Sequence, residues 1–208
     1  MKPIRSDAAE RIVREALRLF AERGYERTSV PDIQEAAGLA RGSGAMYKHF
    51  PSKEAVLRAG IERYIGYAQS AQASVANTPL HPRDALAALA RGMLDSLAAR
   101  RDEMRILWRV VEQFPDLQAR ARREIMQGTY AAVAAWLREA ARKGLLAEND
   151  SAAVAAVLIG SLAMFRVFPA LWGEQTIEVD DERFLRAWSH FAARGLGLDG
   201  GNPASRSD

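Results

Sequence analysis

The residues best suited to do chemistry gather in one short basic segment, residues 36–53. This segment contains Arg41, Lys48 and Lys53, has no Asp or Glu, and places Tyr47 among the cations. Cationic side chains clustered along one segment attract phosphate groups, so this stretch could bind a nucleic-acid backbone. The same charges would also suit a solvated loop, so charge alone does not decide between the two interpretations.

The charge balance of the whole chain points to the same region. Residues 1–65 carry 12 Lys and Arg against 9 Asp and Glu, whereas residues 66–208 carry 17 of each kind. The net charge of +3 therefore lies in the first third of the chain. A polyanionic partner would be expected to bind there.

The sequence lacks the residue patterns that are typical of enzyme active sites and metal sites. It has no cysteine, which excludes a disulfide scaffold, cysteine-ligated metals and cysteine nucleophiles. The three histidines, His49, His81 and His190, lack metal-ligand spacing. Gly42-Ser43-Gly44 lacks the Gly-Lys-Ser/Thr that ends a phosphate-binding loop, and no nucleophile motif is present. We expect no metal, no cofactor and no enzymatic activity. Residues 1–24 carry charges throughout, unlike a secretory signal, so we expect a cytoplasmic protein.

Apolar periodicity and capping residues predict an all-α fold with about nine helices. Gly24 and Gly38 would end the first two helices, and Ser29 would cap the second. The expected helices are 7–23, 29–37, 45–50, 53–75, 83–100, 102–113, 116–143, 151–172 and 181–195. The proline-rich stretch 77–82 is a candidate linker. We expect an N-terminal domain at 7–65, a C-terminal domain at 66–198 and a disordered tail at 199–208.

The predicted helix 151–172 is the most apolar in the chain. Its uncharged part, 151–165, is only 15 residues long before Arg166 intervenes. A membrane span needs about 20 apolar residues. We therefore predict a buried helix and no membrane partner.

The first 65 residues predict three helices, of which the last two form a helix-turn-helix. Its second, small basic helix could enter a DNA major groove, which is about 12 Å wide. Apolar residues would pack the pair against the first helix, namely Ile33, Ala37, Leu39, Met46 and Phe50. The residues left to face outward are Arg41, Ser43, Tyr47, Lys48 and His49. An alternative place for Tyr47 is the core.

Three segments, residues 24–33, 36–39 and 47–55, resemble the DNA-binding domain of TetR/AcrR-type transcriptional regulators. The resemblance implies that Ser29 caps a helix and touches phosphate, that the rings of Tyr47 and His49 lie along the DNA backbone, and that Lys53 reaches phosphate. The turn between Gly38 and Tyr47 is longer than the family's commonest spacing. The implied DNA-binding set is Thr28, Ser29, Arg41, Ser43, Tyr47, Lys48, His49 and Lys53.

The predicted helices 102–113 and 116–143 are apolar over most of their circumference, which is typical of helices buried on two sides. One side could pack in a core and the other could face a ligand cavity, since Met and aromatic side chains suit an adaptable apolar pocket. The alternative is that all of them fill the core. The candidate ligand-binding residues are Met104, Trp108, Met126, Tyr130 and Phe165.

The last two predicted helices have the character of a partner interface. The first is rich in small residues, which allow close approach, and the second carries aromatic residues at helical spacing. In the resembled family, these two helices form a four-helix bundle across a two-fold axis. The candidate interface residues are Ala156, Gly160, Phe184, Trp188 and Phe191. Arg166 is expected to form an interface ion pair or, alternatively, to anchor an acidic ligand.

Together these features predict a homodimeric, ligand-responsive repressor that binds double-stranded, near-palindromic operator DNA and is released by a small, mostly apolar effector. One alternative is a soluble helical small-molecule-binding protein or enzyme whose N-terminal bundle is only structural. Another is an activator, or a regulator without a ligand.

Overall fold

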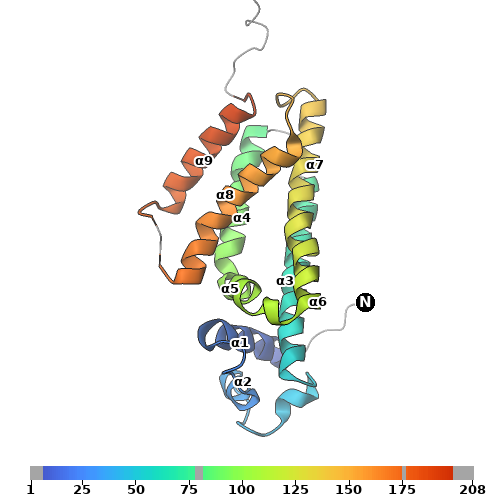
Figure 1. Cartoon of the computed structure of the whole chain (residues 1–208), viewed down its shortest axis with the longest axis vertical. Helices are drawn as coiled ribbons and strands as arrows, with labels where there is room; N and C mark the ends of the chain where they lie inside the picture. Colours follow the sequence, from blue (N-terminus) through green and yellow to red (C-terminus); the bar gives the residue numbers. More distant parts are fainter. Residues whose placement is uncertain (1–6, 78–81, 175–176, 199–208) are drawn as a thin grey trace, which may run out of the picture. The chain divides into compact units, whose positions relative to one another are not determined.

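The computed structural model describes residues 7–77, 82–174 and 177–198. Within them the chain forms nine α-helices and no strand, which confirms the all-α prediction (Figure 1). The helices group into two compact units. Unit 1 holds the described residues up to Ala68 together with Arg100–Ile125, and unit 2 holds Gln69–Ala99 and the described residues from Met126 onward. The predicted disordered tail 199–208 and residues 78–81 of the predicted linker lie outside the described residues.

Unit 1 begins with α1 (Asp7–Arg23), whose bounds match the prediction. Gly24 follows it with φ of 92°, a left-handed conformation that glycine adopts without steric cost. Helix α2 (Val30–Ala36) starts at the predicted cap. There, the Ser29 hydroxyl accepts a hydrogen bond from the Asp32 amide, and the Asp32 carboxylate accepts one from the Ser29 amide. This capping box satisfies two amides that the helix itself leaves without partners.

The predicted recognition helix at 45–50 is shorter than expected. It is a single turn of 3-10 helix, η1 (Ala45–Lys48). Gly44 precedes it with a left-handed φ of 70°, so the helix cannot extend toward its N-terminus. Pro51 follows closely and disfavours a helical conformation at Phe50, which limits extension in the other direction.

The rest of unit 1 consists of the first part of α3 (Lys53–Ala76) and of a segment from the second half of the chain. This segment contains α5 (Arg101–Arg109), the 3-10 turn η2 (Val111–Gln113) and α6 (Pro115–Ala121). Its apolar side chains, including Ile106 and Leu117, join the core formed by α1, α2 and α3. Residues 100–125 therefore pack with the N-terminal helices, although they were expected in the C-terminal domain at 66–198.

Two predicted helices are interrupted. The predicted helix 102–113 is α5 followed by η2, because Pro115 restricts Phe114 and the helix tightens before it ends. The predicted helix 116–143 is a succession of α6, a π-helical segment η3 (Arg122–Gln127) and α7 (Gly128–Arg142).

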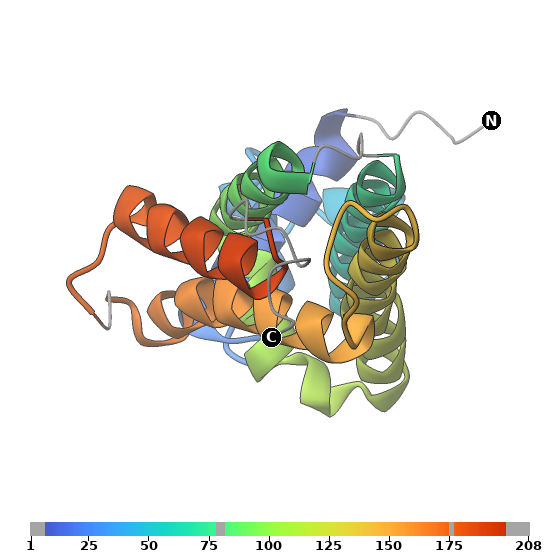
Figure 2. The ribbon, with the colours of Figure 1, turned by 90° about the horizontal axis from the view of Figure 1, so that it is seen from above.

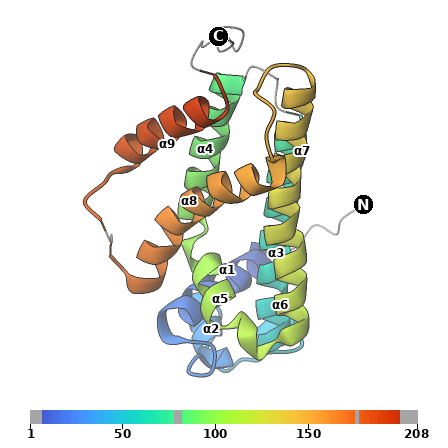
Figure 3. The same ribbon diagram turned by 45° about the horizontal axis from the view of Figure 1, so that its top comes forward.

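Unit 2 contains α4 (Pro82–Ala99), α7, α8 (Ser151–Trp172) and α9 (Asp181–Gly195). Helix α8 contacts both α4 and α7, and α9 contacts α4 (Figure 2). The N-terminal end of α8 lies beside α7, and the helix then runs obliquely away from it (Figure 3). Asp150 and Asp180 cap α8 and α9 by accepting hydrogen bonds from amides of the first turn.

Among the described residues, α8 is the one helix long and apolar enough to cross a membrane. Eight of its residues are buried, and Leu158, Ile159, Leu162 and Phe165 among them join the core of unit 2. This burial agrees with the predicted core helix.

Candidate DNA-binding site

The turn η1 and the residue that follows it present three consecutive side chains to solvent. Tyr47 is 56% exposed, and Lys48 and His49 are exposed as well. On either side of them, Met46 and Phe50 are buried, as predicted. An aromatic ring, an ammonium group and an imidazole at the surface form a set that can contact phosphate and sugar.

The turn before η1 is held against α2 by side chains of α2. Arg41 pairs with Asp32, at 3.0 Å between Nη2 and Oδ1, and also with Glu35. The Gly42 amide donates to Oε1 of the buried Gln34 at 3.1 Å. These contacts define the geometry of the unusually long turn. Arg41 is exposed, as expected, but its pairs with two acidic residues were not predicted from the sequence.

Asp32 lies at the centre of this network. Its carboxylate accepts hydrogen bonds from the Ser29 hydroxyl at 2.5 Å and the Ser29 amide at 3.0 Å. Hydrogen bonds from Ser29 and the nearby Arg41 guanidinium lower the pKa of Asp32. The carboxylate therefore stays charged under ordinary conditions and keeps both Ser29 and Arg41 in place.

Thr28 was expected to contact DNA, but its side chain is buried. It is only 1% exposed, and its hydroxyl donates to the carbonyl of Gly24 at 2.8 Å, with that of Leu19 at 3.4 Å. A side chain enclosed in this way stabilises the turn between α1 and α2 and cannot reach DNA. Ser29, Arg41 and Ser43 are exposed.

Lys53 is half-buried, and its ammonium group is bound within the chain. Nζ donates to the carbonyl of Tyr25 at 2.9 Å and to that of Thr28 at 3.1 Å. It also lies 4.1 Å from the centroid of the Tyr25 ring. Lys53, which the resemblance assigned to phosphate, thus joins the N-terminus of α3 to the α1–α2 turn. The role of Tyr25 as its partner was not predicted from the sequence.

Known proteins match the two parts of the chain. Residues 12–59 match the family described as bacterial regulatory proteins of the tetR family. Residues 84–188 match the C-terminal domain of AefR-like transcriptional repressors. The chain belongs to the tetR family of regulatory proteins. Members of this family are transcriptional regulators, not enzymes.

Curated helix-turn-helix transcriptional regulators match a part of the chain. The uncharacterized regulator YerO of Bacillus subtilis is 41% identical over 61 residues, which are 29% of this chain and 20% of YerO. The repressor KstR2 of Mycolicibacterium smegmatis is 26% identical over 102 residues, 49% of each chain. The matches thus span from a fifth to about half of these relatives.

Solved structures of the tetR family share the fold over most of the chain. PfmR of Thermus thermophilus has a TM-score of 0.65 and 25% identity, with 89% of this chain and 98% of PfmR covered. The fatty acid degradation regulator FadR of Bacillus halodurans has a TM-score of 0.67 and 21% identity, with 89% and 94% covered.

The five candidate ligand residues are distributed over both units. In unit 1, Met104 is buried and Trp108 is 47% exposed. In unit 2, Met126 is 47% exposed, Tyr130 is half-buried and Phe165 is buried.

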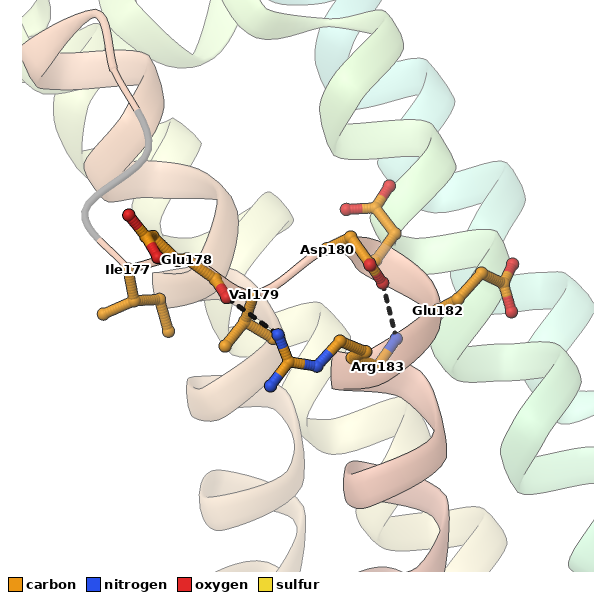
Figure 4. Close-up of a pocket in the computed structure, with 7 residues that line it drawn as sticks. Ile177, Glu178, Val179, Asp180, Glu182 and Arg183 are labelled. Atoms are coloured by element: carbon orange, nitrogen blue, oxygen red, sulfur yellow. Dashed lines mark hydrogen bonds between the residues drawn. The ribbon is translucent and has the colours of Figure 1, made fainter.

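A different hollow, of about 760 Å³ and open to solvent, is lined by residues 177–183 (Figure 4). In it, the Arg183 guanidinium donates to the carbonyl of Glu178 at 3.0 Å. None of the predicted ligand residues lines this hollow.

The five candidate interface residues separate into two groups. Trp188 is 8% exposed, and its indole N–H lies within hydrogen-bond distance of the Ser161 hydroxyl, at 3.0 Å, and the Leu158 carbonyl, at 3.3 Å. Phe184 is half-buried. Both therefore pack inside the chain. Ala156 is exposed, Gly160 is half-buried and Phe191 is 80% exposed.

Arg166 forms its ion pair within the chain. Its guanidinium pairs with Asp181 in the first turn of α9, and Nε donates to the carbonyl of Leu94 in α4 at 3.4 Å. Arg166 thus ties α8 to both neighbouring helices.

Proposed function

We propose that this protein is a transcriptional repressor that binds a near-palindromic operator as a homodimer. The observation that carries the proposal is the exposure of Tyr47 and Lys48 on the single turn η1 and of His49 directly after it, at the position of the family's recognition helix. The repressor KstR2 among the relatives supports repression over activation. The soluble, DNA-binding character of the family supports a place in the cytoplasm.

The proposed DNA-binding residues are the predicted ones that are exposed, together with the half-buried Lys53. They are Ser29, Arg41, Ser43, Tyr47, Lys48, His49 and Lys53. Because two subunits related by a two-fold axis present two such turns, the operator should consist of two inverted half-sites.

The proposed dimer interface is the exposed apolar surface of α8 and α9. Val157 is 71% exposed and Phe191 is 80% exposed, values unusual for large apolar residues in an isolated soluble chain. Together with Ala156 and Gly160, these residues can pack against a second copy. Phe184 and Trp188, which pack within the chain, would then hold α9 in the position that presents Phe191 to the second copy.

The proposed effector is small and mostly apolar, and Met104, Trp108, Met126, Tyr130 and Phe165 remain the candidates to bind it. Flexible Met and aromatic side chains support such a ligand. Binding should weaken the affinity for the operator by about 5–150-fold, the usual range of allosteric coupling.

The test is footprinting of the purified protein on the DNA upstream of its own gene, followed by a screen of small apolar compounds for release. We expect protection of two inverted half-sites that is lost at high salt. A protein that binds this DNA no better than unrelated DNA would contradict the proposal.

A further inference from the structure

We propose that Tyr25 is a positioning residue for DNA binding, through which residues 111–121 set the position of the Lys53 ammonium group. The inference rests on the proposed DNA-binding function. It concerns a side chain that would not itself touch DNA, on the turn between α1 and α2.

The Tyr25 ring is in contact with groups from three elements. Phe20 of α1 lies at 5.1 Å between ring centroids, with the planes inclined by 58°. Phe114, between η2 and α6, meets the ring edge to face at 5.3 Å and 85°. Nζ of Lys53, at the start of α3, lies 4.1 Å from the ring centroid. A cation at this distance from an aromatic ring is attracted by the ring's quadrupole.

Lys53 is positioned by more than the ring. Its ammonium group has three N–H donors, and two of them bind the carbonyls of Tyr25 and Thr28. One donor remains for an anion. Thr28 directly precedes Ser29, the cap of α2. The position of Tyr25 therefore affects the N-termini of both α2 and α3, where amides and a cation can face phosphate.

Residues 111–121 are fastened to α3 next to this cluster. Arg58 binds Asp116 through two contacts, at 2.5 and 3.2 Å, and Glu62 pairs with Arg120 one turn further along. Leu117, between the two pairs, is only 2% exposed. We therefore expect residues 111–121 and the first half of α3 to move together. Phe114 would move with them and change its contact with the Tyr25 ring.

The covalent chain connects this segment to unit 2 on both sides. It follows α4, which ends at Ala99, and leads through η3 into α7. A change in unit 2 that pulls on residues 100–125 would displace Phe114 from the Tyr25 ring. The ring would then be free to turn, and the ammonium group would lose the surface that holds it toward DNA.

The experiment measures how the affinity for DNA depends on salt concentration. Two DNA duplexes are used, one with the sequence upstream of the protein's own gene and one of unrelated sequence. The variants compared with the wild type are Tyr25→Leu, Tyr25→Phe, Phe114→Leu and Lys53→Gln. Losing one phosphate contact in each subunit of a dimer lowers the log–log salt slope by about 1.8. We expect this loss for Tyr25→Leu, Phe114→Leu and Lys53→Gln on both duplexes, and wild-type slopes for Tyr25→Phe, which keeps the ring.

Two controls separate positioning from stability. Ile106→Ala removes a fully buried side chain from the same core and should lower the unfolding midpoint in urea without changing the salt slope. In the Lys53→Gln background, Tyr25→Leu should change the slope no further. If Tyr25→Leu is poorly folded, Phe114→Leu still tests the same contact, because it removes the ring that packs against Tyr25.

Three results would overturn the inference. The first is a wild-type slope for Tyr25→Leu, and the second is a wild-type slope for Phe114→Leu. The third is additive losses in the double variant. If the wild-type protein shows no salt-dependent affinity for either duplex, the proposed DNA-binding function itself fails, and this result is distinct from the other three.

Discussion

Phe165 of α8 and Phe184 of α9 lie face to face, with ring centroids 3.9 Å apart and planes inclined by 9°. The sequence assigned the first ring to a ligand site and the second to a partner interface. In the structure, each ring buries the other, so the pair holds α9 against α8 within one chain. Phe191 lies seven positions after Phe184, about two helical turns further along the same side of α9, and it is 80% exposed, so this part of α9 remains open to a second copy.

Phe191→Asp should convert dimers to monomers. A carboxylate at a residue that the partner covers would be buried without a partner charge, which costs several kcal/mol. Sedimentation equilibrium should show monomers, and the affinity for operator DNA should fall. The matched control is Leu145→Asp, at a 37% exposed apolar residue after α7, which should remain dimeric. A dimeric Phe191→Asp would place the interface elsewhere.

Lys48→Ala should weaken DNA binding without affecting stability. Lys48 is exposed on η1, and the loss of one phosphate contact per subunit should lower the salt slope by about 1.8. Lys53→Ala should lower the slope too, but it should also lower the free energy of unfolding, because two carbonyls lose their donor. Equal unfolding midpoints in urea for the two variants would contradict this distinction.

Glu35→Gln should increase the affinity for DNA. Glu35 holds the Arg41 guanidinium by an ion pair, and its own charge repels phosphate. Exposed ion pairs are worth up to about 1 kcal/mol, so the affinity should rise by about two- to fivefold. Glu22→Gln, which breaks an exposed pair with Arg18 on α1, serves as the matched control and should bind like the wild type. Unchanged binding by Glu35→Gln would remove Arg41 from the proposed DNA-binding set.

Trp136→Phe should destabilise the protein less than Trp188→Phe. Both indoles are buried in the core of unit 2, but among the described residues the N–H of Trp136 has no hydrogen-bond acceptor, whereas that of Trp188 has Ser161 and Leu158. A hydrogen bond contributes about 1 kcal/mol net, so the two variants should differ by roughly this free energy in urea unfolding. A larger loss for Trp136→Phe would mean that its N–H has a partner in solution.

The local features of the fold were predictable from the sequence. The cap at Ser29 and the glycine after α1 both act within one helical turn. A hydrogen bond between residues three or four positions apart depends on residue type and spacing, which the sequence contains. The same reasoning explains why the helix-turn-helix and its exposed Tyr47 and Lys48 could be predicted.

What only the tertiary structure decided concerns residues far apart in the chain. Lys53 binds the carbonyl of a residue 28 positions earlier, and Arg166 pairs with a residue 15 positions later. Phe114 reaches Tyr25 only because residues 100–125 pack against α1 and α3. The sequence shows that Lys53 is a cation and that Phe114 is apolar, but charge and hydrophobicity are not directional. Which partner each side chain meets depends on how the helices pack, and this packing minimises the free energy of the whole core rather than that of any one segment.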